Sequence, residues 1–175
     1  QFVPIMNQEM IVITPVGHPL ATKEEITLHD LERYPVIGYD RTSGLGRFTK
    51  QTYASYGINP NIFCESPNEN AIASLVAEDF GIALVADTDT LDHFQLERLH
   101  LSDITLHHTV YMAYLKGHYQ IPAVKNFISF IKKRRNFCLR GSFFVSIFYS
   151  IPRFFTYSAN LFTSGGWYFV LPSAI

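Results

Sequence analysis

The chain has 175 residues, of which 47% are hydrophobic and 17% are charged, with a formal net charge of -1 at pH 7. A chain this apolar can bury a core, so the composition excludes a disordered polypeptide. The length suits one domain, or one domain with an appendage. The nearly balanced charge excludes the global basic field that many nucleic-acid-binding domains carry.

Local features of composition say less about function. Asp103 is the last acidic residue, and the basic run 132–135 is typical of the solvated end of a helix. The two cysteines, Cys64 and Cys138, show no metal-binding spacing. We expect Cys64 to be a buried thiol, in keeping with a reducing cytoplasm. The N-terminus shows no basic segment followed by an apolar one, so no export signal is predicted.

Residues 1–133 alternate strand-like and helix-like segments with short connections. Apolar β-branched runs predict buried strands, and apolar residues three or four positions apart predict amphipathic helices. The predicted strands are 10–14, 36–39, 61–65, 82–86 and 109–115. The predicted helices are 28–33, 45–56, 67–80 and 122–133. This alternation predicts an α/β fold with a mostly parallel sheet covered by helices.

The clearest local signal marks the start of the helix 67–80. Ser66 is a good N-cap, Pro67 suits the first helical position, and Glu69 completes a capping box. We expect Gly81 to end this helix.

No catalytic or metal-binding constellation is visible. The sequence has no GxSxG, HExxH, GxxxxGK[ST] or GxGxxG pattern, and its paired carboxylates lie in predicted loops. His107 and His108 adjoin at what looks like a strand edge, where neighbours face opposite ways, so they cannot easily share a metal ion. His18, in a predicted loop, is expected to be structural or solvated. We therefore expect no enzyme, no metal site and no cofactor.

Two predicted helix starts offer groups that could bind a ligand. In open α/β sheets, ligands bind beyond the carboxyl ends of strands, where helix N-termini present free N–H groups to anions. The loops 39–44 and 65–68 lie at such places. Their polar side chains are either ligand contacts or only helix caps and solvated loop residues, and spacing does not decide between the two. These side chains are Arg41, Thr42, Ser43, Ser66 and Asn68.

Three stretches, in order, resemble the effector-binding domain of LysR-type transcriptional regulators. They are 9–19 (EMIVITPVGHP), 26–40 (ITLHDLERYPVIGYD) and 65–85 (ESPNENAIASLVAEDFGIALV). The resemblance covers residues 1–133 and implies a type II periplasmic-binding-protein fold with two α/β lobes around a cleft. It also implies a cytoplasmic regulator that binds a small metabolite, often a carboxylate, in that cleft. In the family, an N-terminal helix-turn-helix reads promoter DNA and the whole protein is a homo-oligomer.

The resemblance also assigns ligand-binding residues. It implies that the loop after the strand 36–39, the start of the next helix and the end of the strand 82–86 face the effector. The residues implied are Tyr39, Arg41, Thr42, Ser43, Ser66, Asn68 and Val85. The family usually has a proline after this last strand, where Ala86 and Asp87 stand here. The DNA-binding region and the first half of lobe one have no counterpart in this chain.

Residues 134–175 have no counterpart in the family and form an atypical, aromatic-rich tail. Its uncharged run, 154–175, is near the length of a membrane span but contains Gly165, Gly166 and Pro172, so we expect no membrane contact. We expect the apolar face of the helix 122–133 to pack on the tail or on another chain. An alternative function is left open: an exported solute-binding protein of a transporter, which can have the same fold.

Overall fold

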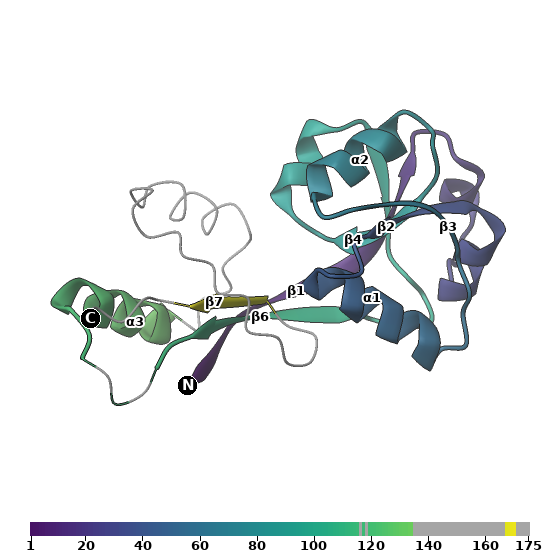
Figure 1. The fold of residues 1–175 in the computed structure, drawn as a ribbon. Coiled ribbons are helices and arrows are strands. Elements are labelled where there is room, and N and C mark those ends of the chain that lie inside the picture. Colours follow the sequence, from purple (N-terminus) through teal and green to yellow (C-terminus); the bar gives the residue numbers. More distant parts are fainter. Residues whose placement is uncertain (116, 118, 135–166, 171–175) are drawn as a thin grey trace. The chain divides into compact units, whose positions relative to one another are not determined.

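The computed structural model describes residues 1–115, 117, 119–134 and 167–170 (Figure 1). The chain falls into two compact units, a larger one of residues 8–108 and a smaller one that joins residues 1–7 to residues 109 onward. The boundary lies within two strands, β1 (Phe2–Pro15) and β6 (His107–Ala113).

The larger unit is built on a mixed sheet. Its other strands are β2 (Pro35–Tyr39), β3 (Asn61–Ser66), β4 (Ala83–Ala86) and β5 (Leu96–Leu99). Strand β2 pairs parallel with β3, whereas β1 pairs antiparallel with β4 and with β5. A parallel bridge from Val36 to Ile82 joins β2 to the start of β4. The strand order is therefore β3, β2, β4, β1.

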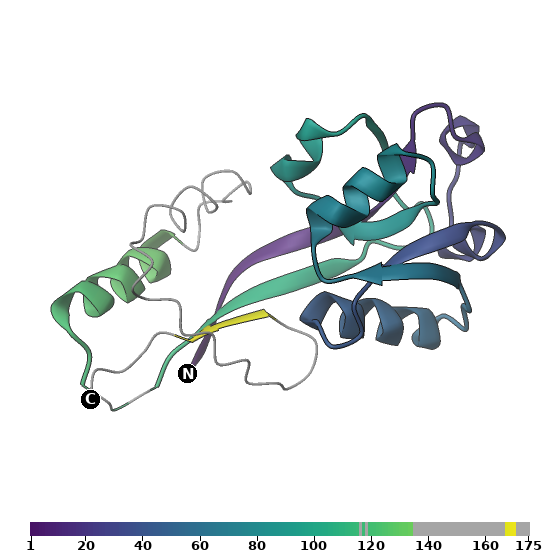
Figure 2. The same ribbon diagram turned by 45° about the horizontal axis from the view of Figure 1, so that its top comes forward.

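Two helices cover opposite faces of this sheet: α1 (Gly44–Ser55) and α2 (Glu69–Ala77). Helix α1 connects β2 to β3, which lies on one side of β2 in the sheet. Helix α2 connects β3 to β4, which lies on the other side of β2. Because such crossovers are right-handed, steps in opposite directions put their helices on opposite faces. Figures 1 and 2 show α2 on one side of the strands and α1 on the other.

The core of the larger unit follows from this coverage. Ile11, Val12 and Ile13 in β1 are fully buried, as is every residue of β4, because both faces of these strands are covered. Strand β3 lies at the edge of its sheet and alternates exposed and half-buried residues. Cys64, which we expected to be buried, is therefore only half-buried.

Helix α2 begins two residues later than the capping signal predicted. Ser66 remains in β3, paired with Tyr39, and its carbonyl accepts a hydrogen bond from the N–H of Asp40 at 3.0 Å. This pairing holds Ser66 in the strand, so Asn68 becomes the N-cap and its Oδ1 accepts from the N–H of Asn70 at 2.9 Å. The prediction of Ser66 as the cap is wrong.

The end of α2 also differs from the prediction. Asp79 takes a left-handed conformation (φ 59°), and its N–H donates to the carbonyl of Val76 at 3.0 Å, as in a common helix C-cap. Asp79, and not Gly81, therefore ends the helix. Gly81 has another reason to be glycine, because a Cβ there would lie 2.4 Å from the carbonyl oxygen of Pro35.

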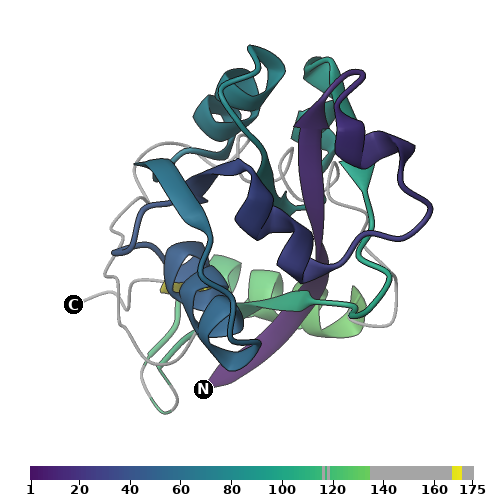
Figure 3. The same cartoon turned by 90° about the vertical axis from the view of Figure 1, so that its right-hand side faces the viewer.

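No helix or strand was predicted between β4 and β6, but the segment contains both. It holds a 3-10 helix, η3 (Asp89–His93), and strand β5. Two other short helices, η1 (Pro19–Thr22) and η2 (Leu28–Arg33), lie between β1 and β2 and are also 3-10. Figure 3, which looks at the right-hand side of Figure 1, shows η1 and η2 in dark purple beside β1.

The smaller unit combines the first residues of β1 with β6, α3 (Pro122–Arg134) and β7 (Trp167–Val170). Strand β7 pairs parallel with β6. A small apolar cluster joins Ile128 and Ile131 of α3 to Val3, Met112 and Tyr114. Within the described residues, the apolar face of α3 thus packs on β1, on β6 and on the residue after β6. The expectation that it also packs on the tail or on another chain stays a prediction.

Most of the tail, residues 135–166 and 171–175, lies outside the described residues, together with Cys138 and most of the uncharged run. The division into residues 1–133 and 134–175 therefore stays a prediction. Among the residues that the structure does describe, no helix is both long enough and apolar enough to cross a membrane.

Candidate functional site

The register of β2 and β3 brings the two predicted ligand loops to one edge of the sheet. Tyr39, the last residue of β2, is paired with Ser66, the last residue of β3. The loop after β2 leads to Ser43, the N-cap of α1, and the loop after β3 leads to Asn68, the N-cap of α2. Both helices therefore start at the carboxyl ends of adjacent parallel strands, where α/β folds bind ligands.

The start of α1 is closed by hydrogen bonds within its own loop. Ser43 Oγ accepts from the N–H of Gly46 at 2.9 Å and donates to the carbonyl of Asp40 at 2.7 Å. The N–H and hydroxyl of Thr42 both donate to the Asp40 carboxylate. Of the two hydroxyls predicted as ligand contacts, that of Ser43 thus caps the helix and that of Thr42 is hydrogen-bonded within the loop.

Backbone N–H groups remain at this helix start. Within the described residues, no acceptor is recorded for the N–H of Gly44 or of Leu45, as expected for the first turn of a helix. Such donors, at the positive end of the helix dipole, suit an anion.

Arg41, the predicted grip for a carboxylate, pairs with a residue of the neighbouring loop. Its Nε donates to Oε1 of Glu65 at 2.6 Å, while 71% of its side chain is exposed. The pair links the loop after β2 to the end of β3.

The start of α2 repeats the arrangement with different residues. Ser66 Oγ accepts from the N–H of Asn68 at 3.2 Å, and the side chain of Asn68 caps the helix. Among the described residues, no acceptor is recorded for the N–H of Glu69 or of Ala71. Within the described part of the chain, each helix start therefore offers two N–H groups that have no recorded acceptor.

Tyr39 connects the end of β2 to α2. Its side chain is buried, with 5% exposed, and its hydroxyl donates to Oε1 of Glu69 at 3.0 Å. Burial raises the pKa of Tyr39 well above its usual value, and the charge of Glu69 adds to the effect. Burial also raises the pKa of Glu69; the hydrogen bond from Tyr39 opposes this rise, while the negative charge of Asp87 adds to it.

The end of β4 contributes an ion pair next to this site. Arg98 Nη1 donates to Oδ1 of Asp87 at 3.1 Å, and Arg98 also pairs with Asp92. Val85, which the resemblance placed on the wall of the site, is fully buried in register with Ile11. It offers no surface to a ligand in this structure and is left out of the candidate contacts.

Sequence reasoning missed Glu69 and the pair of Asp87 with Arg98. It assigned Glu69 to a capping box, whereas the side chain turns to Tyr39. The pairing of strands β2 and β3 could have suggested this contact, because it brings the residues after both strands together. Asp87 and Arg98 are 11 positions apart, and no local pattern links them.

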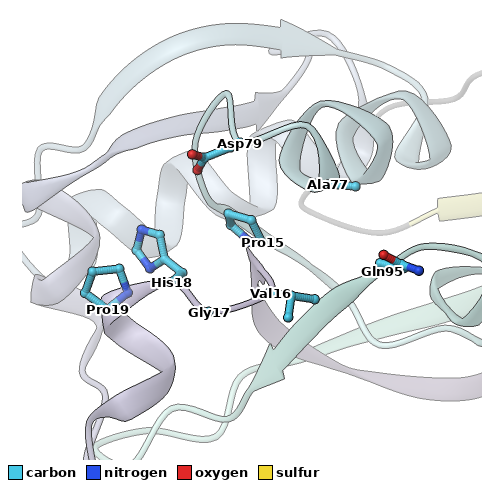
Figure 4. Close-up of a pocket in the computed structure, with 8 residues that line it drawn as sticks. All are labelled: Pro15, Val16, Gly17, His18, Pro19, Ala77, Asp79 and Gln95. Atoms are coloured by element: carbon cyan, nitrogen blue, oxygen red, sulfur yellow. The ribbon is translucent and has the colours of Figure 1, made fainter.

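A separate pocket of about 350 Å³ lies at the other end of the sheet (Figure 4). It is formed where β1 and α2 end, and His18 accepts there from the N–H of Leu20, which gives this histidine a structural role. No start of α1 or α2 contributes to it, so we do not assign the effector to this pocket. Its lining residues are Pro15, Val16, Gly17, His18, Pro19, Ala77, Asp79 and Gln95.

Comparison with known proteins decides the family. A protein-family model described as the LysR substrate binding domain matches residues 1–136. The chain belongs to this family. Its α/β fold, a lobe of the type II periplasmic-binding-protein kind, is the one that the sequence predicted.

Curated relatives are transcriptional regulators. The chain is 25% identical over 131 residues to the uncharacterized HTH-type transcriptional regulator YybE of Bacillus subtilis (strain 168), covering 75% of this chain and 45% of that protein. It is 29% identical over 84 residues to the HTH-type regulator CysB of Burkholderia cenocepacia, covering 48% of this chain and 27% of that protein. The chain thus spans half or less of the length of these relatives. Nothing here supports the transport alternative.

Solved structures agree with this family. The effector binding domain of QuiR in complex with shikimate has a TM-score of 0.73 and 31% identity, with 79% of this chain and 67% of that chain covered. The regulatory domain of Synechocystis PCC6803 CcmR in complex with 2-PG has a TM-score of 0.68 and 20% identity, with coverage of 76% and 65%. The second similarity shows the fold alone.

Proposed function

We propose that this chain is the effector-sensing part of a LysR-type transcriptional regulator and binds a small carboxylate-bearing metabolite where α1 and α2 begin. It acts in the cytoplasm by binding and not by catalysis. In the whole regulator, an N-terminal domain reads promoter DNA, and the regulator is a homo-oligomer.

One observation carries this proposal: two helix starts with unsatisfied N–H groups meet at one sheet edge. The four donors belong to Gly44, Leu45, Glu69 and Ala71. The positive ends of two helix dipoles lie at the same place. A carboxylate there accepts hydrogen bonds from the N–H groups and is also attracted by the dipoles. The complex of QuiR with shikimate, which is a carboxylate, supports the same ligand class for a relative.

A proline substitution can remove one donor without disturbing the helix. Gly44 is the first residue of α1, a position where proline is well tolerated, and Ser43 before it has the extended conformation that proline requires (φ -75°, ψ 160°). Gly44→Pro therefore deletes an N–H, whereas the control Gly44→Ala keeps it.

The experiment is a calorimetric titration of the purified chain and both variants with shikimate and a set of small mono- and dicarboxylates. We expect at least one carboxylate to bind, and Gly44→Pro to weaken that binding about tenfold relative to Gly44→Ala, the effect of one hydrogen bond to a charged group. Equal binding by the two variants, or binding of no carboxylate by the parent chain, would contradict the proposal.

A further inference from the structure

Glu69 differs from the other carboxylates around the two helix starts. Asp40 accepts hydrogen bonds from Thr42, and Glu65 and Asp87 pair with arginines. Among the described residues, the one hydrogen-bond donor recorded for the Glu69 carboxylate is the neutral hydroxyl of Tyr39, and no cation pairs with it.

The surroundings of Glu69 make a carboxylate with one neutral donor and no paired cation energetically unfavourable. Its side chain is half-buried, and a carboxylate removed from water needs hydrogen bonds or a counter-charge. Arg41 and Arg98, the nearby cations described above, are held by Glu65 and by the two aspartates. Oε1 faces Tyr39, which leaves Oε2 without a recorded donor in the described part of the chain.

We propose that Glu69 selects an effector that carries a protonated amine as well as a carboxylate. The inference rests on the proposed function, since it assigns the second group of the ligand bound at that same site. Tyr39 holds Oε1 of Glu69 in place, and the ammonium group of the effector binds Oε2.

The position of Glu69 also limits the length of the effector. Glu69 is the first residue of α2, so its own N–H is one of the donors for the ligand carboxylate while its side chain receives the amine. Both groups of the effector are thus bound at one helix start. A compact amino acid, with few bonds between amine and carboxylate, fits this arrangement better than a long diamine or a dicarboxylate.

The charge of Glu69 and its hydrogen bond can be tested separately. Glu69→Gln removes the negative charge but keeps an oxygen to accept from Tyr39. Tyr39→Phe keeps the charge and removes the group that positions it. Glu78→Gln is the matched control, because Glu78 is an exposed glutamate at the other end of α2.

The probes are matched sets of amino acid, 2-hydroxy acid and unsubstituted acid: alanine, lactate and propionate; aspartate, malate and succinate; glutamate, 2-hydroxyglutarate and glutarate. Shikimate is included as a carboxylate without an amine. Binding to the purified chain is measured by titration calorimetry, and thermal melting confirms that each variant is folded.

We expect the amino acid of at least one set to bind about tenfold more tightly than its hydroxy and unsubstituted partners, the effect of a charge-assisted hydrogen bond. Glu69→Gln should abolish this preference. Tyr39→Phe should reduce the preference, and Glu78→Gln should leave it unchanged.

Two results would overturn the inference, and they differ in what they leave standing. If carboxylates bind with no preference for the amine, or if the preference survives in Glu69→Gln, Glu69 does not select an amine but the proposed function stands. If no carboxylate binds, shikimate included, the proposed function fails together with the inference.

Discussion

The starts of α1 and α2 lie at the same edge of the sheet, but they are built differently. At α1, Ser43 caps the helix, one of the two roles that the sequence left open, and the exposed Arg41 pairs with Glu65. At α2, strand pairing retains Ser66, the cap moves to Asn68, and the glutamate meant for a capping box turns to a buried tyrosine. A cap motif that directly follows a strand is therefore read correctly only when the pairing of that strand is known.

Of the two helix starts, that of α1 is the more tightly packed, because Gly46 lies directly against the backbone of the preceding loop. A Cβ at Gly46 would lie 2.0 Å from the carbonyl oxygen of Asp40, which is backbone and has to move. We expect Gly46→Ala to lower the free energy of unfolding by about 2–3 kcal/mol and to abolish carboxylate binding. Urea unfolding and calorimetry measure the two effects.

Gly57→Ala is the contrast for this substitution. Gly57 has a positive φ of 67° but open space around its Cβ, so its replacement strains the backbone without a clash. A loss of about 1 kcal/mol with binding intact is expected. If Gly46→Ala behaves no worse than Gly57→Ala, the loop at α1 is more yielding than its geometry indicates.

At α2, the next largest effect is expected from the buried hydroxyl of Tyr39. Tyr39→Phe leaves the half-buried Glu69 carboxylate without its recorded donor. The free energy of unfolding should fall by about 1–2 kcal/mol, as for other buried groups that lose a partner. The matched control is Tyr56→Phe, at the exposed end of α1, which should change stability by less than about 0.5 kcal/mol. Chemical denaturation curves of equal slope would measure the loss of unfolding free energy in both variants. Equal losses in Tyr39→Phe and Tyr56→Phe would contradict the prediction.

The position of the cap can be tested with single alanines. Asn68→Ala should cost about 1 kcal/mol, and Ser43→Ala about the same, because each removes a side chain that caps a helix. Ser66→Ala, at the residue that the sequence predicted as the cap, should cost less than either. A larger loss for Ser66→Ala than for Asn68→Ala in thermal melts would return the cap to Ser66.

The smallest effect concerns the charge of Glu69 and its pH dependence. Burial raises the pKa of Glu69 in the folded chain above its usual value, although the hydrogen bond from Tyr39 opposes the rise. A raised folded pKa contributes stability that is full below the unfolded pKa and is lost as the pH rises through the folded pKa. Without ligand, Glu69→Gln should therefore be more stable than the parent chain at neutral pH.

This difference should shrink as the pH falls below the unfolded pKa of Glu69. Unfolding midpoints in urea across the acidic to neutral range would show it, with Glu78→Gln as the control that keeps Glu69. A gap between Glu69→Gln and the parent that stays constant with pH would mean that the carboxylate of Glu69 is well solvated in the folded chain.

Much of the fold could be predicted from the residues alone. Apolar runs such as Met10–Thr14 fix where strands form, because such segments must be buried, and alternation with amphipathic helices fixes the α/β class. Local caps such as Ser43 follow from residue chemistry over three or four positions. The family resemblance in three ordered stretches identified the effector-binding domain, which the family model confirms over residues 1–136.

Which side chains act together could not be predicted, because it depends on contacts between distant parts of the chain. Tyr39 lies 30 residues from Glu69, and Arg98 lies 11 from Asp87. Val3, one of the partners of α3, lies more than 100 residues from it, and no local pattern reports such distances. The parallel register of β2 and β3 places Tyr39 beside Ser66 and so beside the start of α2. That register depends on how the sheet packs as a whole. The sequence therefore predicted both helix starts but not the contact of the Glu69 carboxylate with Tyr39.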